Sequence, residues 1–121
     1  MHKYIVGNWK MNGTSAELAE IEAISAMAKS YAPAVDSALC LLATLINRAA
    51  TQLPDFSIGG QDCHFNVSGA HTGCVSATML ADAGAALTLV GHSERRADQH
   101  ESDADICGKA EAAEAAGLKV I

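Results

Sequence analysis

Aromatic and basic residues are scarce in this 121-residue sequence. Phe, Trp and Tyr make up 4% of it, whereas hydrophobic residues as a whole make up 50%, so a core must consist mainly of small and aliphatic side chains. Eight Lys and Arg residues stand against fourteen Asp and Glu, giving a formal net charge of −6, and the basic residues are scattered. This charge balance argues against a nucleic-acid partner.

Long apolar runs and secretion signals are also missing. No apolar run reaches the roughly 18–20 residues that a membrane span requires. The first ten residues, MHKYIVGNWK, contain neither a long apolar segment nor a small-residue cleavage site. We therefore expect neither a membrane-bound nor a secreted protein.

The cysteines and histidines show no spacing that is typical of metal ligands. The four cysteines form no CxxC pair and occupy separate segments, which indicates reduced thiols in a cytoplasmic protein, not a disulfide framework. The five histidines lack the HExxH spacing that places two ligands on one helix face. The sequence predicts a cytoplasmic location and no metal site.

Strand-like and helix-like segments alternate along the chain, and no linker divides residues 1–121 into separate domains. Thr14 and Glu17 form a capping-box pattern, and Ser76 and Ser102 stand at N-cap positions of later helices. The expected strands are 4–9, 38–43, 56–62, 87–91 and 118–121, and the expected helices are 14–32, 47–53, 76–84 and 101–117.

This β-α order, with strands that are apolar on both faces, predicts an α/β fold with parallel strand pairing. A doubly wound nucleotide-binding fold would require G-x-G-x-x-G after the first strand. The sequence GNWKMNG at residues 7–13 does not supply it, and no Walker-type phosphate loop occurs elsewhere.

Two expected strands end in polar side chains. Alternate residues of a strand share a face. If both strands belong to one parallel barrel, their polar ends converge at the carboxyl-terminal rim, where barrel enzymes keep their active sites. Taken singly, such side chains are more often a solvated lysine, a structural histidine and solvent-facing or interface charges. The first face comprises Tyr4, Val6, Asn8 and Lys10, and the second comprises Thr88, Val90, His92 and Glu94.

Four motifs resemble the triosephosphate isomerase family in order and spacing. They are VGNWKMNG (6–13), GQDCHFNVSGAHTG (60–73), MLADAGA (79–85) and VGHSERR (90–96). The resemblance implies a (β/α)8 barrel, of which this chain would form a half-barrel of four βα units plus the start of the fifth strand. It also implies a cofactor-free isomerase of glycolysis and gluconeogenesis that interconverts dihydroxyacetone phosphate and glyceraldehyde 3-phosphate through an enediolate.

The resemblance assigns roles to the polar strand ends. Lys10 would meet the substrate's phosphate and developing oxyanion, and Asn8 would orient the substrate. His92 would be the neutral electrophile that polarises the carbonyl group, a role already described for this family. Glu94 would hold Lys10 and take part in the proton transfers.

The resemblance also implies a homodimer or higher homo-oligomer. Thr72 resembles the residue that reaches across the dimer to steady the partner's site. Cys74 stands where the family usually carries an acid that pairs with an arginine of the SERR run, so Arg95 is an interface candidate. Glu101 resembles a buried polar residue near that interface. Association would also cover the open edges of the sheet.

A complete barrel of this kind needs about 250 residues. The resemblance therefore implies a truncated chain without the family's glutamate base after the sixth strand, its lid and its later phosphate loops. We expect the chain to be nearly inactive by itself, and we expect an open half-barrel to splay Lys10 and His92 apart. The alternatives are a non-catalytic, self-associating half-barrel with residual phosphate binding and a scaffold whose site residues are relics.

Overall fold

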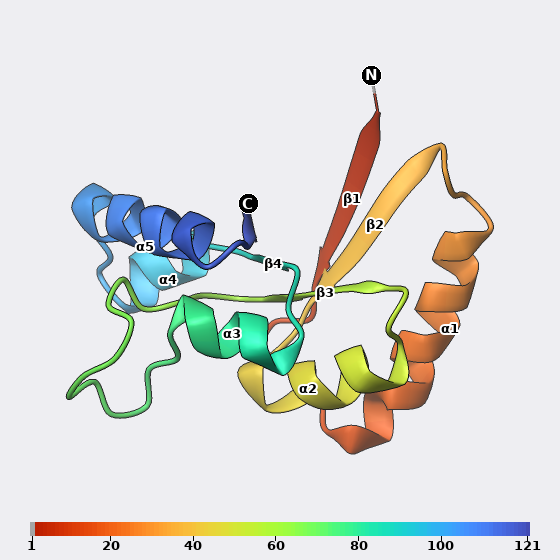
Figure 1. Ribbon diagram of the computed structural model, residues 1–121, viewed down its shortest axis with the longest axis horizontal. Coiled ribbons are helices and arrows are strands. Elements are labelled where there is room, and N and C mark those ends of the chain that lie inside the picture. Colours follow the sequence, from red (N-terminus) through yellow and green to blue (C-terminus); the bar gives the residue numbers. More distant parts are fainter. Residues whose placement is uncertain (1) are drawn as a thin grey trace.

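The computed structural model describes residues 2–121, which form one five-stranded parallel sheet with its strands in sequential order. In Figure 1 the helices form an arc, from α1 at the right through α2 and α3 below to α4 and α5 at the left, and the strands lie inside it. The predicted parallel half-barrel is thus confirmed. The strands are β1 (Lys3–Asn8), β2 (Val35–Cys40), β3 (Ser57–Gly60), β4 (Leu87–Thr88) and β5 (Lys119–Val120), and the helices are η1 (Ser15–Glu17), α1 (Leu18–Lys29), α2 (Ala43–Gln52), α3 (Ala77–Ala83), α4 (Ser93–Asp98) and α5 (Asp103–Ala115).

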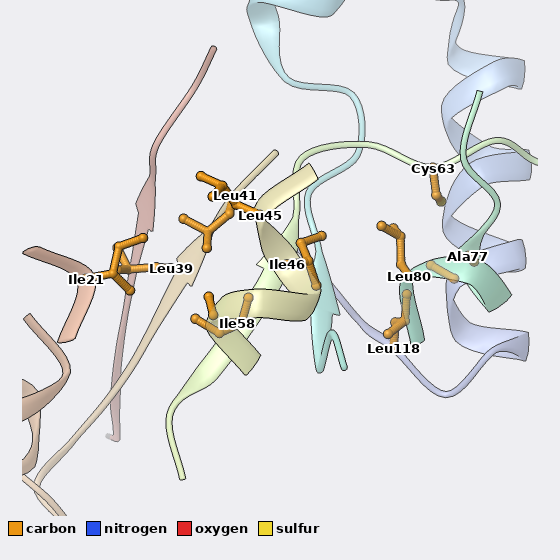
Figure 2. Packing of buried hydrophobic residues seen from close by; sticks show 12 residues of the cluster. Ile21, Leu39, Leu41, Leu45, Ile46, Ile58, Cys63, Ala77, Leu80 and Leu118 are labelled. Carbon is orange, nitrogen blue, oxygen red and sulfur yellow. The ribbon is translucent and has the colours of Figure 1, made fainter. Parts of the chain in front are cut away.

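The main core lies between the sheet and the helices (Figure 2). Leu39 of β2 and Ile58 of β3 pack there against aliphatic side chains of the helices, among them Ile21 of α1, Leu45 of α2 and Leu80 of α3. All five are at most 7% exposed. Complete burial of one such side chain contributes about 1.5–3 kcal/mol, so this layer stabilises the fold strongly.

A second, smaller cluster lies on the opposite, inner face of the sheet. It contains Cys40 of β2 and Leu87 of β4, and Tyr4 and Val6 of β1 pack against it. The Lys119 ammonium group of β5 also lies 4.5 Å from the centre of the Tyr4 ring. The sheet is therefore curled until the first strand meets the fifth across its inner face.

The expected helix caps are present. Thr14 and Glu17 form the capping box ahead of α1. Ser76 Oγ accepts a hydrogen bond from the Met79 amide at 3.2 Å, and Ser102 caps α5 in the same way. These side chains satisfy amide groups that have no partner inside a helix, which explains why the cap positions follow directly from the sequence.

Several expected boundaries were wrong, among them those of the second strand and the second helix, and β4 ends at Thr88 instead of residue 91. β2 covers Val35–Cys40 instead of 38–43, and α2 begins at Ala43 instead of residue 47. Leu41 and Leu45 are both fully buried, on either side of the strand-to-helix boundary. Because the chain passes from a buried strand directly into a buried helical turn, apolar patterning cannot mark where one ends.

The helix α4 was not expected. None of its residues is buried, so it carries no apolar periodicity. It begins instead at a cap, because the His92 ring accepts a hydrogen bond from the Glu94 amide. None of the helices within residues 2–121 is long and apolar enough to cross a membrane.

Candidate active site

The polar ends of β1 and β4 meet at a cavity of about 490 Å³. All four residues expected at this rim line it: Asn8, Lys10, His92 and Glu94. The Lys10 ammonium group donates a hydrogen bond to Glu94 Oε1 at 2.7 Å, across 84 positions of sequence. The expectation of a splayed cluster is therefore wrong. The half-barrel is already curved, since Lys119 of β5 lies 4.5 Å from the centre of the Tyr4 ring of β1, and we had attributed such curvature only to a closed barrel.

Lys10 reaches the cavity through an unusual backbone conformation. Its φ is +57°, a left-handed value that is uncommon for a residue with a side chain. The Lys10 amide donates to Asn8 Oδ1 at 2.9 Å. Asn8, the last residue of β1, thus uses its side chain to turn the chain out of the strand.

His92 does not reach the cavity by the strand alternation that we expected. Leu87 and Leu89 occupy the inner face of the sheet, whereas Val90 packs against the helix-side core. The predicted face through Thr88 and Val90 is therefore reversed. Gly91, with φ +64°, turns the chain after β4 and so brings His92 to the cavity as the N-cap of α4.

One nitrogen of the His92 ring makes a hydrogen bond within the protein. Nδ1 accepts the hydrogen bond from the Glu94 amide at 3.1 Å, and it lies 3.7 Å from Glu94 Oε2. An accepting Nδ1 carries no proton, so the proton of the neutral ring resides on Nε2. The ring can then present Nε2–H as a hydrogen-bond donor.

Glu94 is held as an anion. The hydrogen bond from Lys10 lowers the pKa of this carboxyl group against a smaller opposing effect of burial, and the charge of Lys10 lowers it further. A carboxylate with a lowered pKa is a weak base. Glu94 is therefore suited to orienting Lys10 and poorly suited to taking a proton from carbon.

Arg95 and Glu101, both predicted as interface residues, lie in a charge cluster within the chain. Arg95 bonds Glu101 Oε2 through Nε at 3.0 Å and Asp62 Oδ2 through Nη2 at 3.1 Å. Lys109 of α5 bonds both Asp62 and Glu101. The side chains of Glu101 and Lys109 are only 5% and 8% exposed. This cluster joins α4 to α5 and to the end of β3.

The cluster shifts two pKa values in opposite directions. Burial alone would raise the pKa of Glu101, but hydrogen bonds from Lys109 and Arg95 outweigh it and the pKa is lowered. Burial alone would lower the pKa of Lys109, but bonds to Glu101 and Asp62 raise it. Glu101 and Lys109 are therefore both charged at neutral pH.

The other two predicted interface residues lie on the loop between β3 and α3. Thr72 and Cys74 are both exposed, and Cys74 also borders the cavity. For all four residues, Thr72, Cys74, Arg95 and Glu101, the role at an interface stays a prediction. Within residues 2–121, no three His, Cys, Asp or Glu side chains are grouped so as to hold a metal ion.

Sequence reasoning missed Gln61, which also lines the cavity. Its side-chain amide donates to the carbonyl oxygens of Lys10, at 2.9 Å, and of Cys40, at 3.2 Å. The signal was available, because Gln61 is the first polar residue after β3, just as Lys10 and His92 follow β1 and β4.

A parallel half-barrel with polar residues at the carboxyl ends of its strands defines the class of (β/α)-barrel proteins. The crystal structure of triosephosphate isomerase from Bartonella henselae superposes on this chain with a TM-score of 0.93 and 43% sequence identity. The superposition covers 99% of this chain and 50% of that one.

The triosephosphate isomerase family model matches residues 3–121. Triosephosphate isomerase from Ruegeria sp. (strain TM1040) is 56% identical over 98% of this chain, and that from Rhodopseudomonas palustris (strain BisA53) is 53% identical over 97%. The chain belongs to the triosephosphate isomerase family. It spans about half the length of these curated relatives, 48% of each.

Proposed function

We propose that this chain provides the electrophilic part of a site that interconverts dihydroxyacetone phosphate and glyceraldehyde 3-phosphate in the cytoplasm, without a cofactor. The observation that carries the proposal is the contact between Lys10 and Glu94 beside His92, in one cavity. Two strand ends that are far apart in the sequence present a cation and a neutral donor to the same space.

Each side chain has a chemical role in this proposal. The Lys10 ammonium group attracts the substrate's phosphate and the oxyanion that develops during enolisation. The Nε2–H of His92 donates to the substrate's carbonyl oxygen, and Asn8 orients the substrate. Fixed donors aimed at developing charge supply the largest part of the acceleration in many enzymes.

The chain assayed by itself should show little turnover. Enolisation also needs a base that removes a proton from carbon, and Glu94 is occupied by Lys10. The resemblance to the family places that base after a sixth strand, beyond the five strands of this chain. The proposal is therefore an isomerase site that works together with residues supplied by another polypeptide segment.

The second candidate is a self-associating half-barrel that binds phosphate without catalysis. The exposed edge of the sheet favours it, because Ile5 on β1 is 60% exposed and Ile121 beside β5 is 46% exposed. Pairing of two such edges would remove apolar surface from water. We propose a homodimer or higher homo-oligomer for either function, with Thr72 and Cys74 at the interface.

The experiment is a complementation assay. Isomerase activity of the 121-residue chain is measured alone and after mixing with the second half of the Ruegeria relative. We expect negligible activity alone and a gain on mixing that Lys10→Met and His92→Gln abolish. If mixing gives no activity while sulfate binds and light scattering shows a dimer, the second candidate replaces the first. Ordinary turnover of the chain alone would refute the account of the missing base.

Residual ligand binding can be measured by calorimetry. Phosphate must compete with Glu94 for the single ammonium group of Lys10, which is half exposed. We therefore expect a dissociation constant near the millimolar range, about −4 kcal/mol. Micromolar binding that Lys10→Met abolishes would show that a stronger anion site exists than this geometry supports.

A further inference from the structure

The backbone of Lys10 is fixed from two sides. On one side, its amide donates to Asn8 Oδ1. On the other side, its carbonyl oxygen accepts from Gln61 Nε2 at 2.9 Å. Since φ is +57° at a residue with a side chain, the conformation persists only when surrounding contacts enforce it.

Hydrogen bonds fix the Gln61 side chain to neighbouring strand ends of the sheet. It directly follows β3, and its amide also donates to the Cys40 carbonyl at the end of β2. The same Cys40 oxygen accepts the Trp9 amide at 2.9 Å, which holds the chain beyond β1 against β2. One side-chain amide therefore ties the carboxyl ends of three strands together.

This tie is specific to the residue that enters the cavity. Among the side chains of residues 2–121, Gln61 is the one that bonds the Lys10 carbonyl group. The φ torsion of Lys10 sets the direction of its side chain, and the bond from Gln61 to the Lys10 carbonyl group restrains φ together with ψ. Loss of the Gln61 donor would let the peptide rotate and would move the ammonium group away from Glu94.

We infer that Gln61 is a positioning residue for Lys10: its amide holds the left-handed backbone that aims the Lys10 ammonium group at Glu94 and at the anion of the ligand. Its action runs through Lys10 and not through contact with the ligand. The ligand part of this inference rests on the proposed function, whereas the Lys10–Glu94 contact does not.

The test uses the Glu94 carboxyl group as an internal reporter. In the wild type, its pKa is lowered first by the hydrogen bond from Lys10. Carbon-detected NMR titration of Glu94 is compared in the wild type, Gln61→Met, Lys10→Met and the double variant. Gln61→Met keeps the side-chain length but removes the donor. We expect it to raise the Glu94 pKa towards the value in Lys10→Met, and we expect no additional rise in the double variant.

A matched control is Gln99→Met, because Gln99 borders the same cavity but makes no hydrogen bond to Lys10. It should leave the Glu94 titration unchanged. Gln61→Asn serves if Gln61→Met does not fold, since the shorter amide keeps its polarity but cannot span the same distance. A Glu94 titration in folded Gln61 variants that matches the wild type would overturn the inference. The inference would also be overturned if Gln61→Met raised the Glu94 pKa by the same amount in the Lys10→Met background as in the wild type.

Sulfate affinity separates this inference from the proposed function, because sulfate keeps its charge over the whole pH range of the titration. We expect about three- to tenfold weaker binding in Gln61→Met, the effect of losing one orienting hydrogen bond. If the wild type does not bind sulfate, the anion site in the proposed function fails, and the Glu94 titration still decides the role of Gln61. If the wild type binds and Gln61→Met binds equally well, the positioning role is refuted.

Discussion

Lys109→Met should destabilise the fold far more than the loss of a surface ion pair. The variant keeps an apolar side chain of similar length but removes the cation that bonds Asp62 and Glu101. Breaking a buried pair costs about 3–5 kcal/mol, because a charge stays buried without compensation. Arg95 still bonds Glu101 at 3.0 Å, so we expect the lower end, about 3 kcal/mol.

Equilibrium unfolding in urea measures this cost. With a slope near 2 kcal/mol per molar, about 3 kcal/mol lowers the midpoint by about 1.5 M. Arg96→Met is a matched control. The Arg96–Asp103 pair has the same 2.9 Å separation as the Lys109–Asp62 pair, but its side chains are 46% and 92% exposed. Such surface pairs contribute at most about 1 kcal/mol. Equal midpoints for Lys109→Met and Arg96→Met would refute the reasoning.

The same cluster predicts a pH dependence. A carboxyl group whose pKa is lowered by folding stabilises the fold above its ordinary pKa of about 4.3, and that contribution disappears as the pH falls through the lower, folded value. Glu101 is such a group. Wild-type stability should therefore decrease below about pH 4, and Lys109→Met should show a smaller decrease, because part of the lowering comes from Lys109. The Lys109 pKa is raised, so its own contribution is complete below about pH 10.4 and is lost only as the pH rises through the higher, folded value.

Three further substitutions and conditions test other parts of the structure. Leu45→Ala should cost about 2–5 kcal/mol in urea unfolding, because Leu45 is fully buried in the main core; a cost below about 1 kcal/mol would show that the site collapses around the deletion. Thr14→Ala removes the N-cap and should cost about 1 kcal/mol, which Thr14→Ser should largely restore. Burial raises the pKa of Cys63 to about 11. The stability that this buried thiol contributes is complete below the ordinary thiol pKa of about 8.5, and it should be lost as the pH rises through 11. A thiol reagent at pH 7.5 should label exposed Cys74 quickly and Cys63 only on unfolding, and equally fast labelling would contradict the structure.

Four residues of the candidate site could be predicted, but its geometry could not. Asn8, Lys10, His92 and Glu94 lie at or beyond the ends of apolar strands, and that pattern placed them at one rim. The route of His92 was not predictable, since it depends on the left-handed Gly91 and on a short helix without a buried face. The partners of Arg95 and Glu101 were also missed, because their contacts to Asp62 and Lys109 cross from one element to another.

The sequence by itself determined the order of the strands and of all α-helices except α4, the parallel pairing of the strands and the caps that begin α3 and α5. These features depend on interactions within a few residues, or on apolar patterns that repeat along one segment. Only the tertiary structure decided that Tyr4 of β1 meets Lys119 of β5, and that Lys10 meets Glu94. Sheet curvature results from the packing of side chains on several strands at once. No single segment of the sequence carries that information.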